Sequence, residues 1–173
     1  SRVKMSEHDS HIPIASLGKY FINSVRDIAP SVTFGYIKAD PERVAMLRKE
    51  YGFHEGDFVV GLTWTSTAPI IGGHKSVPLE AFRPILDKPH LKFINLQYGD
   101  SQRDGDGFHP SLITTHIDTF FDMENVAALM EICTVIISPS CANVHLAGAM
   151  GKDVLLLDAN KLWYWNNRVG NES

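Results

Sequence analysis

Short apolar runs alternate with segments of helical periodicity along most of the chain. Before the first run, Asp40 supplies an N-cap, Pro41 suits a first helical position, and apolar residues recur at helical spacing up to Gly52, which predicts a helix of about three turns. Five apolar runs are predicted to be strands, at 58–64, 92–98, 111–117, 134–137 and 153–157. Further helices are predicted at 78–86, from Asp122 to Cys133 and at 142–150, with loops at 65–76, 101–110 and 138–140.

This order of elements predicts the α/β class. Strands that alternate with helices form a parallel sheet with right-handed crossovers and helices on both faces, so the expected fold is a doubly wound, Rossmann-like sheet. We assume the Rossmann strand order 3-2-1-4-5, with the more polar third strand at an edge. In that order a ligand crevice opens outside the carboxyl ends of the first and fourth strands, where the strand order reverses.

The first 39 residues differ from the rest of the chain. Histidines and prolines interrupt them around one amphipathic stretch at 14–28. We expect residues 1–39 to be a linker or the tail of a preceding domain, and residues 40–173 to form the Rossmann-like domain. Because the first residue is Ser, we also expect the chain to be a piece of a longer protein.

Composition narrows the classes of function. The 173 residues carry 16 Lys and Arg against 20 Asp and Glu, a net charge of −4, so nucleic acid is not an expected partner. No apolar run approaches the roughly 20 residues that cross a bilayer, and no signal peptide opens the chain, so a cytoplasmic protein is expected. The two cysteines lack metal or disulfide spacing, and no dinucleotide-binding or P-loop glycine motif is present, so no metal or cofactor is expected.

Two polar loops are expected to face each other across the crevice. One runs from Thr65 to Ser76 and carries Lys75; the other, at 138–143, follows the fourth strand. The helix that starts near Ser140 directs unpaired N–H groups and a partial positive charge at the crevice, and its dipole alone would stabilise a phosphate by on the order of 1 kcal/mol. Lys75 would add a full positive charge from the opposite loop.

Each of these residues has an alternative role. Ser140 is equally expected to do no more than cap its own helix. Lys75 is by default a solvated surface charge, and His145 suits a partly buried histidine bonded to a carbonyl as well as it suits a ligand or catalytic group.

Other candidate sites carry less chemistry. Residues 104–107, Asp-Gly-Asp-Gly, lack the later Glu of a calcium loop and are expected to form a flexible turn. His8 and His11 lack a third metal ligand and are expected to be exposed. The aromatic residues at 163–165 suit either a sugar platform or packing against a neighbouring domain.

One extended stretch resembles a known family. The run at 135–152, VIISPSCANVHLAGAMGK, resembles the signature of the carboxyl-terminal domain of GT-B glycosyltransferases of the heptosyltransferase-like family 9, especially those attached to tetratricopeptide repeats. Further matching segments follow the family's order and cover nearly all of residues 11–165: HIPIASL at 11–17, IKADP at 37–41, VGLTW at 60–64, KSVPL at 75–79 and FINLQYGD at 93–100.

The resemblance implies a division of the site between two domains. In that family two Rossmann-like domains face each other; the second mainly holds a nucleotide-sugar donor and the first mainly holds the acceptor. This chain resembles the second, truncated at its carboxyl end. The implied contacts to the donor diphosphate are Lys75, Ser138, Ser140, Cys141, Ala142 and Asn143. Those implied near the ribose or base are Thr65, Ser66, Gln97, Tyr98, Gly99 and Asp100, with His145 as a further contact.

The resemblance also implies a mechanism without a metal. Negative charge grows on the departing diphosphate as the sugar leaves, and a lysine with oriented N–H groups would stabilise that charge. The general base is expected in the missing amino-terminal domain, so no catalytic residue is assigned here and the isolated chain is expected to be inactive. Tetratricopeptide repeats are a further expected partner. Ser140, Cys141 and Asp153 stand where the family often has Asp, Thr and Pro.

Three functions therefore stay open. The first is the donor-binding domain of a nucleotide-sugar-dependent glycosyltransferase that acts on a glycan, lipid or protein. The second is a non-catalytic scaffold or interaction module with the same fold, as Pro139 and Ser140 suggest. The third is a nucleotide-sugar epimerase of the same architecture.

Overall fold

The computed structural model describes residue 10 and residues 12–13, 16–23, 35–68, 70 and 72–158. The chain divides into two units, residues 1–33 and residues 34–173. In the first unit, the described residues contain one short helix, α1 (Gly18–Phe21), inside the amphipathic stretch noted at 14–28. The sequence features at His8, at His11 and at 163–165 lie outside the described residues.

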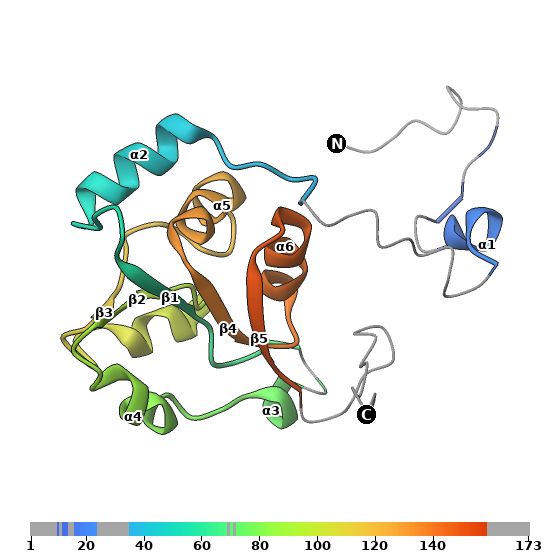
Figure 1. The fold of residues 1–173 in the computed structure, drawn as a ribbon. Coiled ribbons are helices and arrows are strands. Elements are labelled where there is room, and N and C mark those ends of the chain that lie inside the picture. Colours follow the sequence, from blue (N-terminus) through green and yellow to red (C-terminus); the bar gives the residue numbers. More distant parts are fainter. Residues whose placement is uncertain are drawn as a thin grey trace, which may run out of the picture. The chain divides into compact units, whose positions relative to one another are not determined.

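A five-stranded parallel sheet forms the centre of the second unit (Figure 1). Its strands lie in the order β3-β2-β1-β4-β5, and every neighbouring pair is parallel, which confirms the predicted doubly wound α/β fold and its strand order. Leu62, the last residue of β1, lies opposite both Asn95 of β2 and Ile137 of β4. The strands are β1 (Phe58–Leu62), β2 (Leu91–Asn95), β3 (Leu112–Ile113), β4 (Val135–Pro139) and β5 (Asp153–Leu157).

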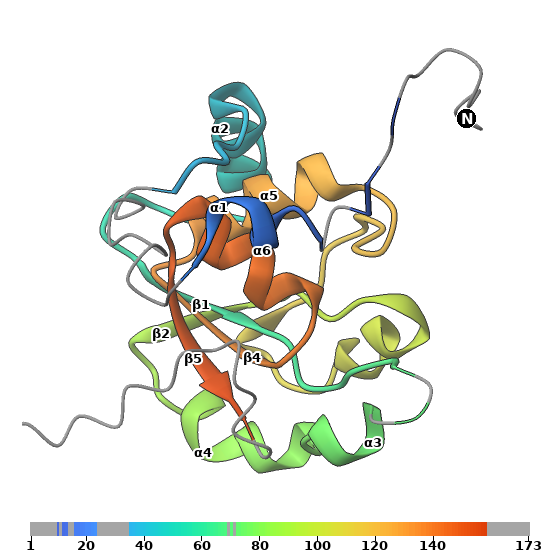
Figure 2. The ribbon, with the colours of Figure 1, turned by 90° about the vertical axis from the view of Figure 1, so that its right-hand side faces the viewer.

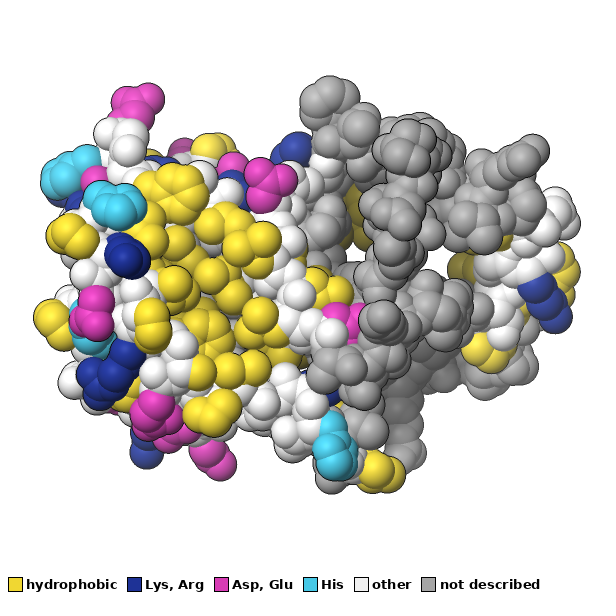
Figure 3. Space-filling view, turned by 60° about the horizontal axis from the view of Figure 1, so that its bottom comes forward, with side chains coloured by type: hydrophobic (Ala, Val, Ile, Leu, Met, Phe, Trp, Pro, Cys, Tyr) yellow, Lys and Arg dark blue, Asp and Glu magenta, His cyan; other side chains and the backbone are white. Residues whose placement is uncertain are grey.

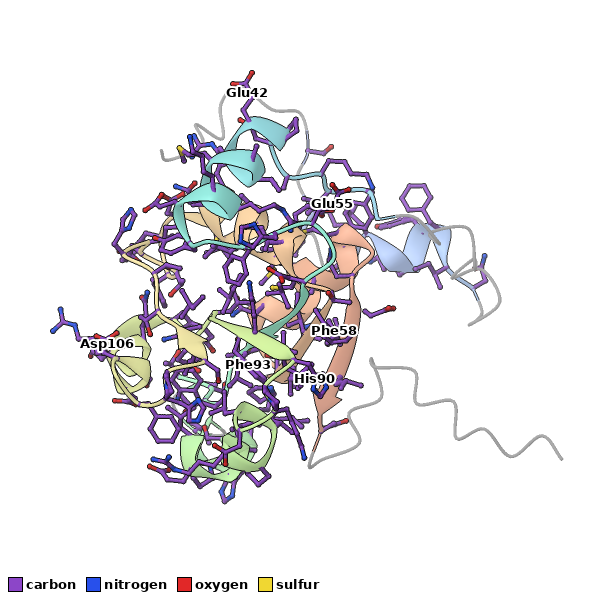
Figure 4. The ribbon with its side chains drawn as sticks, turned by 60° about the vertical axis from the view of Figure 1, so that its left-hand side comes forward. Glu42, Glu55, Phe58, His90, Phe93 and Asp106 are labelled. Atoms are coloured by element: carbon purple, nitrogen blue, oxygen red, sulfur yellow. The ribbon has the colours of Figure 1, made fainter. Side chains whose placement is uncertain are left out.

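Helices cover both faces of this sheet. Helices α2, α5 and α6 lie on one side, and the 3-10 helix η4 with α4 lies on the other (Figures 1 and 2). Because successive strand residues point to opposite faces, Val59 packs in the first layer and Val60 in the second. Phe93 of β2 is fully buried in the second layer, and Figure 4 shows it on the side that faces α4. The bounds are α2 (Pro41–Glu50), η4 (Leu79–Phe82), α4 (Arg83–Leu86), α5 (Met123–Ile132) and α6 (Ala142–Met150).

The helix boundaries follow the capping residues that the sequence predicts. Asp40 accepts a hydrogen bond from the N–H of Glu42 at 2.9 Å where α2 begins, and Asp122 accepts one from the N–H of Asn125 at 3.1 Å where α5 begins. Gly151 ends α6 with a φ of 76°, a left-handed conformation that glycine adopts without strain. Local signals therefore fix these three ends.

The prediction of a loop at 101–110 is wrong for residues 101–105, and the predicted third strand is too long. A 3-10 helix, η5 (Gly99–Gly105), occupies the first part of that loop, and β3 has only two residues. Hydrogen bonds of two side chains, the buried Asn95 and the half-buried Gln102, explain both differences. The Asn95 amide donates to the Gln102 carbonyl at 2.8 Å and so holds η5. The Gln102 amide donates to the carbonyls of Thr115 and Ile117, which therefore bond to a side chain rather than to a strand.

Smaller differences occur at the other strand ends. β1 stops at Leu62 rather than at residue 64. The N–H of Thr63 still donates to the carbonyl of Ile137, but the N–H groups of Trp64 and Thr65 donate to the side chain of Gln97. β4 runs on to Pro139 instead of ending at residue 137. The loop predicted at 65–76 contains one helical turn, α3 (Gly72–Lys75).

Candidate functional site

The loop after β1 is closed at its base by the hydrogen bonds of one serine. Ser76 Oγ donates to the carbonyl of Gly72 at 2.8 Å, accepts from the N–H of Ser66 at 3.1 Å and lies 2.6 Å from Thr65 Oγ1. Gly72 is required at its position because a Cβ there would collide with the carbonyl oxygen of Ser66. The closed loop presents the half-buried Lys75 beyond the carboxyl end of β1.

Helix α6 is fastened to the same edge of the sheet by Asn143. Its buried side-chain amide donates to Thr63 Oγ1 at 3.0 Å and to the carbonyl of Leu96 at 2.8 Å, just beyond the ends of β1 and β2. The N-cap residue, Cys141, makes no capping hydrogen bond with its side chain. The N–H groups of Ala142 and Asn143 have no partner within the helix, so the start of α6 offers donors and the positive end of the helix dipole.

The loop after β1 and the start of α6 meet at one cleft. Lys75 Nζ lies 3.5 Å from the carbonyl oxygen of Ser140, which is 65 residues away in sequence. Both residues line a cavity of about 480 Å³, a size typical of small-molecule sites. Of the residues predicted to bind a donor, the structure brings to this cavity Lys75, Ser140, Cys141, Ala142, Asn143, Ser66 and Tyr98.

Three other predicted contacts, Thr65, Gln97 and Ser138, form hydrogen bonds within the fold and do not line this cavity. Gln97 is fully buried, and its carboxamide makes four hydrogen bonds, at 2.9 to 3.2 Å, to backbone groups of Trp64, Thr65 and Tyr98. Ser138 is also fully buried, and its hydroxyl donates to the carbonyl of Pro139 at 2.9 Å. These two side chains position the loops around the cleft.

A second cavity continues from the first. Its volume is about 760 Å³, and it shares Thr67 and Phe120 with the smaller one. Gly99 and Asp100, predicted near the ribose or base, line it together with Arg103 of η5. A ligand with two parts could therefore place an anionic group beside Lys75 and a larger group over η5.

Aromatic side chains lie at the junction of the two cavities. The rings of Tyr98 and Phe120 lie 6.2 Å apart, and Phe121 packs edge-on against Phe120 with centroids 4.8 Å apart. Phe120 and Phe121 are 49% and 80% exposed, so their faces are open to a ligand. Burial, followed by the neighbouring Cys141, raises the pKa of Tyr98, which keeps its hydroxyl neutral.

Phe120 and Phe121 are not among the site residues that the sequence predicts. Phe120 and Phe121 follow β3 and directly precede the N-cap of α5. The rule that places ligands where the strand order reverses does not indicate them, because β3 is an edge strand and already ends at Ile113.

The remaining candidates lie elsewhere. His145 is exposed on α6 and lines neither cavity. Burial raises the pKa of Cys133 to about 12, so its thiol stays protonated. In the described part of the chain, no three His, Cys, Asp or Glu side chains gather in a way that could hold a metal ion. No described helix combines the length and the apolar character needed to cross a membrane.

Comparison with known proteins relates the fold to glycosyltransferases. No family model matches the chain. The chain is 29% identical over 144 residues to protein FlbA of Caulobacter vibrioides, and the match covers 79% of this chain and 24% of FlbA. It therefore spans about a quarter of that relative. A solved glycosyl transferase family 9 structure from Veillonella parvula is similar with a TM-score of 0.53 and 18% identity, over 69% of this chain and 36% of that one. The chain thus has a glycosyltransferase family 9-like fold.

Proposed function

We propose that this chain is the donor-binding half of a GT-B glycosyltransferase that uses a nucleotide-sugar donor. The observation that carries the proposal is the meeting of Lys75 and the start of α6 at one cleft. The family 9-like fold and the resemblance at residues 135–152 support it. The cleft lies where the strand order reverses, and doubly wound sheets bind their ligands at that position.

The proposed ligand of the smaller cavity is the donor diphosphate. The Lys75 ammonium would neutralise one of its charges. The N–H groups of Ala142 and Asn143 would donate to phosphate oxygens, aided by a helix dipole equivalent to about half a positive charge. The hydroxyl of Thr67, an exposed residue of the loop after β1, lines the same cavity and could add a further hydrogen bond.

The proposed ligand of the larger cavity is the nucleoside. The exposed face of Phe120 offers a stacking surface for a planar base at the junction of the two cavities. The carboxylate of Asp100 could accept hydrogen bonds from ribose hydroxyls, since it lies at the start of η5 and lines the same space.

Catalysis by the complete protein would use this half for charge stabilisation. As the bond from the sugar to the diphosphate breaks, negative charge grows on the leaving oxygen, and Lys75 with the α6 N–H groups would stabilise it. This step needs no metal. The acceptor and the general base that activates its hydroxyl would come from an amino-terminal domain, so the isolated chain should bind donors without transferring sugar.

The open cleft argues against the alternative of a non-catalytic scaffold. A site that had lost its ligand would be expected to be filled by its own side chains, whereas Lys75 and Tyr98 border an open cavity of about 480 Å³. An epimerase would use the same donor site. Incubation of the complete protein with nucleotide sugars in the absence of acceptor would reveal it by interconversion of the sugars.

Isothermal titration calorimetry with UDP, ADP, GDP and a sugar derivative of each tests the proposal. We expect one of these nucleotides to bind, and Lys75→Met to weaken that binding by roughly 10- to 100-fold, because a hydrogen bond to a charged group contributes about 1.5–3 kcal/mol. Lys88→Met is the matched control, since Lys88 is exposed and outside both cavities. Absence of heat with every nucleotide, or equal losses in both variants, would overturn the proposal.

A further inference from the structure

A groove runs along α2, at the edge of the sheet opposite the donor cleft. Two cavities of about 520 and 360 Å³ form this α2 groove, and they share Ala45 and Arg48. Glu131 and Lys152, which also line it, shortly precede the first residues of β4 and β5, whereas the cleft lies beyond the carboxyl ends of the strands. No residue that lines the α2 groove lines either cavity of the cleft.

Backbone contacts fix one wall of the α2 groove. The N–H of Ile37 donates to the carbonyl of Ala149 at 3.0 Å, and a Cβ on Gly35 would collide with the backbone of Met150. The segment before α2 is therefore fastened to the end of α6, and this places Lys38 at the groove.

Positive charge gathers in the α2 groove, although the whole chain carries a net charge of −4. Its basic lining residues are Lys38, Arg48, Lys49 and Lys152. Among the described residues that line it, Glu131 is the only acid, and its carboxylate lies 3.8 Å from Lys152 Nζ. By contrast, Figure 3 shows mainly hydrophobic side chains over the sheet on the side of α4.

The cations of the groove lie close together and are only partly neutralised. Burial raises the pKa of Cys133, and the charges of Lys152 and Arg48 oppose that rise, so both cations lie near the same thiol. In the part of the chain that the structure describes, the ammonium groups of Lys38 and Lys49 have no hydrogen-bond or ion-pair partner. Such a concentration of one sign of charge attracts an anionic partner.

The length and the floor of the groove favour a peptide over a compact anion. Lys38 lines one cavity and Lys49 the other, along a helix of 10 residues that is about 15 Å long. Apolar side chains lie between these cations, and a free phosphate would leave them without contact. They belong to Ala39, Pro41, Val44, Ala45, Phe53 and Met150.

We propose that the α2 groove is a docking surface for an acidic peptide segment of a partner protein. Carboxylates of the segment would pair with Lys38, Arg48 and Lys49, and its apolar side chains would contact the floor. Because the groove and the cleft share no residue, this docking does not depend on donor binding.

Fluorescence anisotropy of the full chain with labelled peptides tests the charge requirement. The probe is a fluorescein-labelled dodecapeptide of Glu and Leu, and the control probe carries Gln in place of Glu. We expect saturable binding of the Glu peptide that weakens with added salt. Lys38→Glu should lower the affinity by about 3- to 10-fold, because it replaces an attraction with a repulsion. Lys88→Glu makes the same change of charge at an exposed position outside the groove and should leave the affinity unchanged.

A second pair of variants tests the position of the peptide. Ala45 is exposed and lines both cavities of the groove, so Ala45→Glu should lower the affinity by about 10-fold or more. Met46→Glu is the matched control, because Met46 is the next residue of α2, is 53% exposed and lines neither cavity. Circular dichroism identical to that of the unmodified chain shows that the variants fold.

Three results would overturn the proposal. The first is no saturable binding of the Glu peptide, or equal binding of the Glu and Gln peptides. The second is an equal loss of affinity in each groove variant and its control. The third is displacement of the peptide by millimolar inorganic phosphate, or tighter binding of a fluorescein-labelled oligonucleotide, which would assign the groove to phosphate groups instead.

Discussion

Replacing Gln97 with Met would remove four hydrogen bonds from a fully buried position. The backbone groups of Trp64, Thr65 and Tyr98 would lose these partners; Trp64 and Tyr98 are buried, and Thr65 is half-buried. Each such bond contributes about 1 kcal/mol, and each buried group left unsatisfied costs about 1–3 kcal/mol, so we expect the free energy of unfolding to fall by roughly 3–5 kcal/mol. Met is similar to Gln in size, so the loss would arise from the hydrogen bonds.

Equilibrium urea unfolding, followed by circular dichroism, measures this loss. With an m-value of about 2 kcal/mol/M, the expected change lowers the unfolding midpoint by roughly 1.5–2.5 M urea. Leu96→Met is the matched control, because Leu96 is adjacent and fully buried but has no polar side-chain atoms. A volume-conserving apolar substitution of this kind costs less than about 1.5 kcal/mol.

A loss in Gln97→Met no larger than that in Leu96→Met would refute the reasoning. Nucleotide binding separates the two roles that have been assigned to Gln97. If the residue contacts the donor, as the family resemblance implies, the variant should lose affinity while keeping its stability. The hydrogen bonds of Gln97 predict the opposite order, in which stability falls first and affinity falls only because the loop at 65–76 loosens.

Two further predictions concern titratable groups. Hydrogen bonds from the side chain and backbone of Asn125 hold the pKa of Asp122 below its ordinary value. This carboxylate therefore stabilises the fold above about pH 4, and the contribution is lost as pH falls through the folded pKa. In Asp122→Asn the urea midpoint should depend less on pH between about pH 5 and pH 2, and an unchanged pH profile would contradict this. Because burial raises the pKa of Cys133 to about 12, a thiol reagent at pH 8 should modify Cys141 in the cleft and spare Cys133, as mapped by peptide mass; two rapidly modified thiols would be inconsistent with the structure.

The sequence predicts the bounds of helices and strands correctly where capping residues and glycines set them locally. The bounds of α6 at 142–150 and of β5 at 153–157 agree with prediction, because Gly151 punctuates the chain between them. The start of α5 follows from Asp122 for the same reason. The alternation of strands and helices predicts a parallel sheet with right-handed crossovers. The strand order 3-2-1-4-5 was assumed from the Rossmann fold, and the structure confirms it.

Prediction failed where distant side chains replace backbone pairing. The third strand reads as seven residues, yet Gln102 takes the carbonyls of Thr115 and Ile117 and leaves a strand of two. Nothing local to residues 111–117 indicates that competition. The hydrogen bonds of Gln102 reach residues 13 and 15 positions away, and such pairings are determined only by the folded chain.

The candidate site shows the same division. Sequence placed Lys75 and the start of α6 on facing loops, because the carboxyl ends of parallel strands share an edge, and the structure brings them together. The sequence could not distinguish residues whose side chains face the cleft from residues whose hydrogen bonds position the surrounding loops. Asn143 and Gln97 have the polarity of ligand contacts, but their partners include Thr63, 80 residues from Asn143, and only the fold reveals that pairing.

The most direct measurement is a nuclear magnetic resonance titration of the amide groups with the nucleoside diphosphate that binds best. The account predicts saturating shifts for the N–H groups of Ala142 and Asn143, and it predicts that the corresponding nucleoside without phosphates leaves these two signals in place while it still moves residues near Phe120. Saturation with the diphosphate without any shift at the start of α6 would contradict the account.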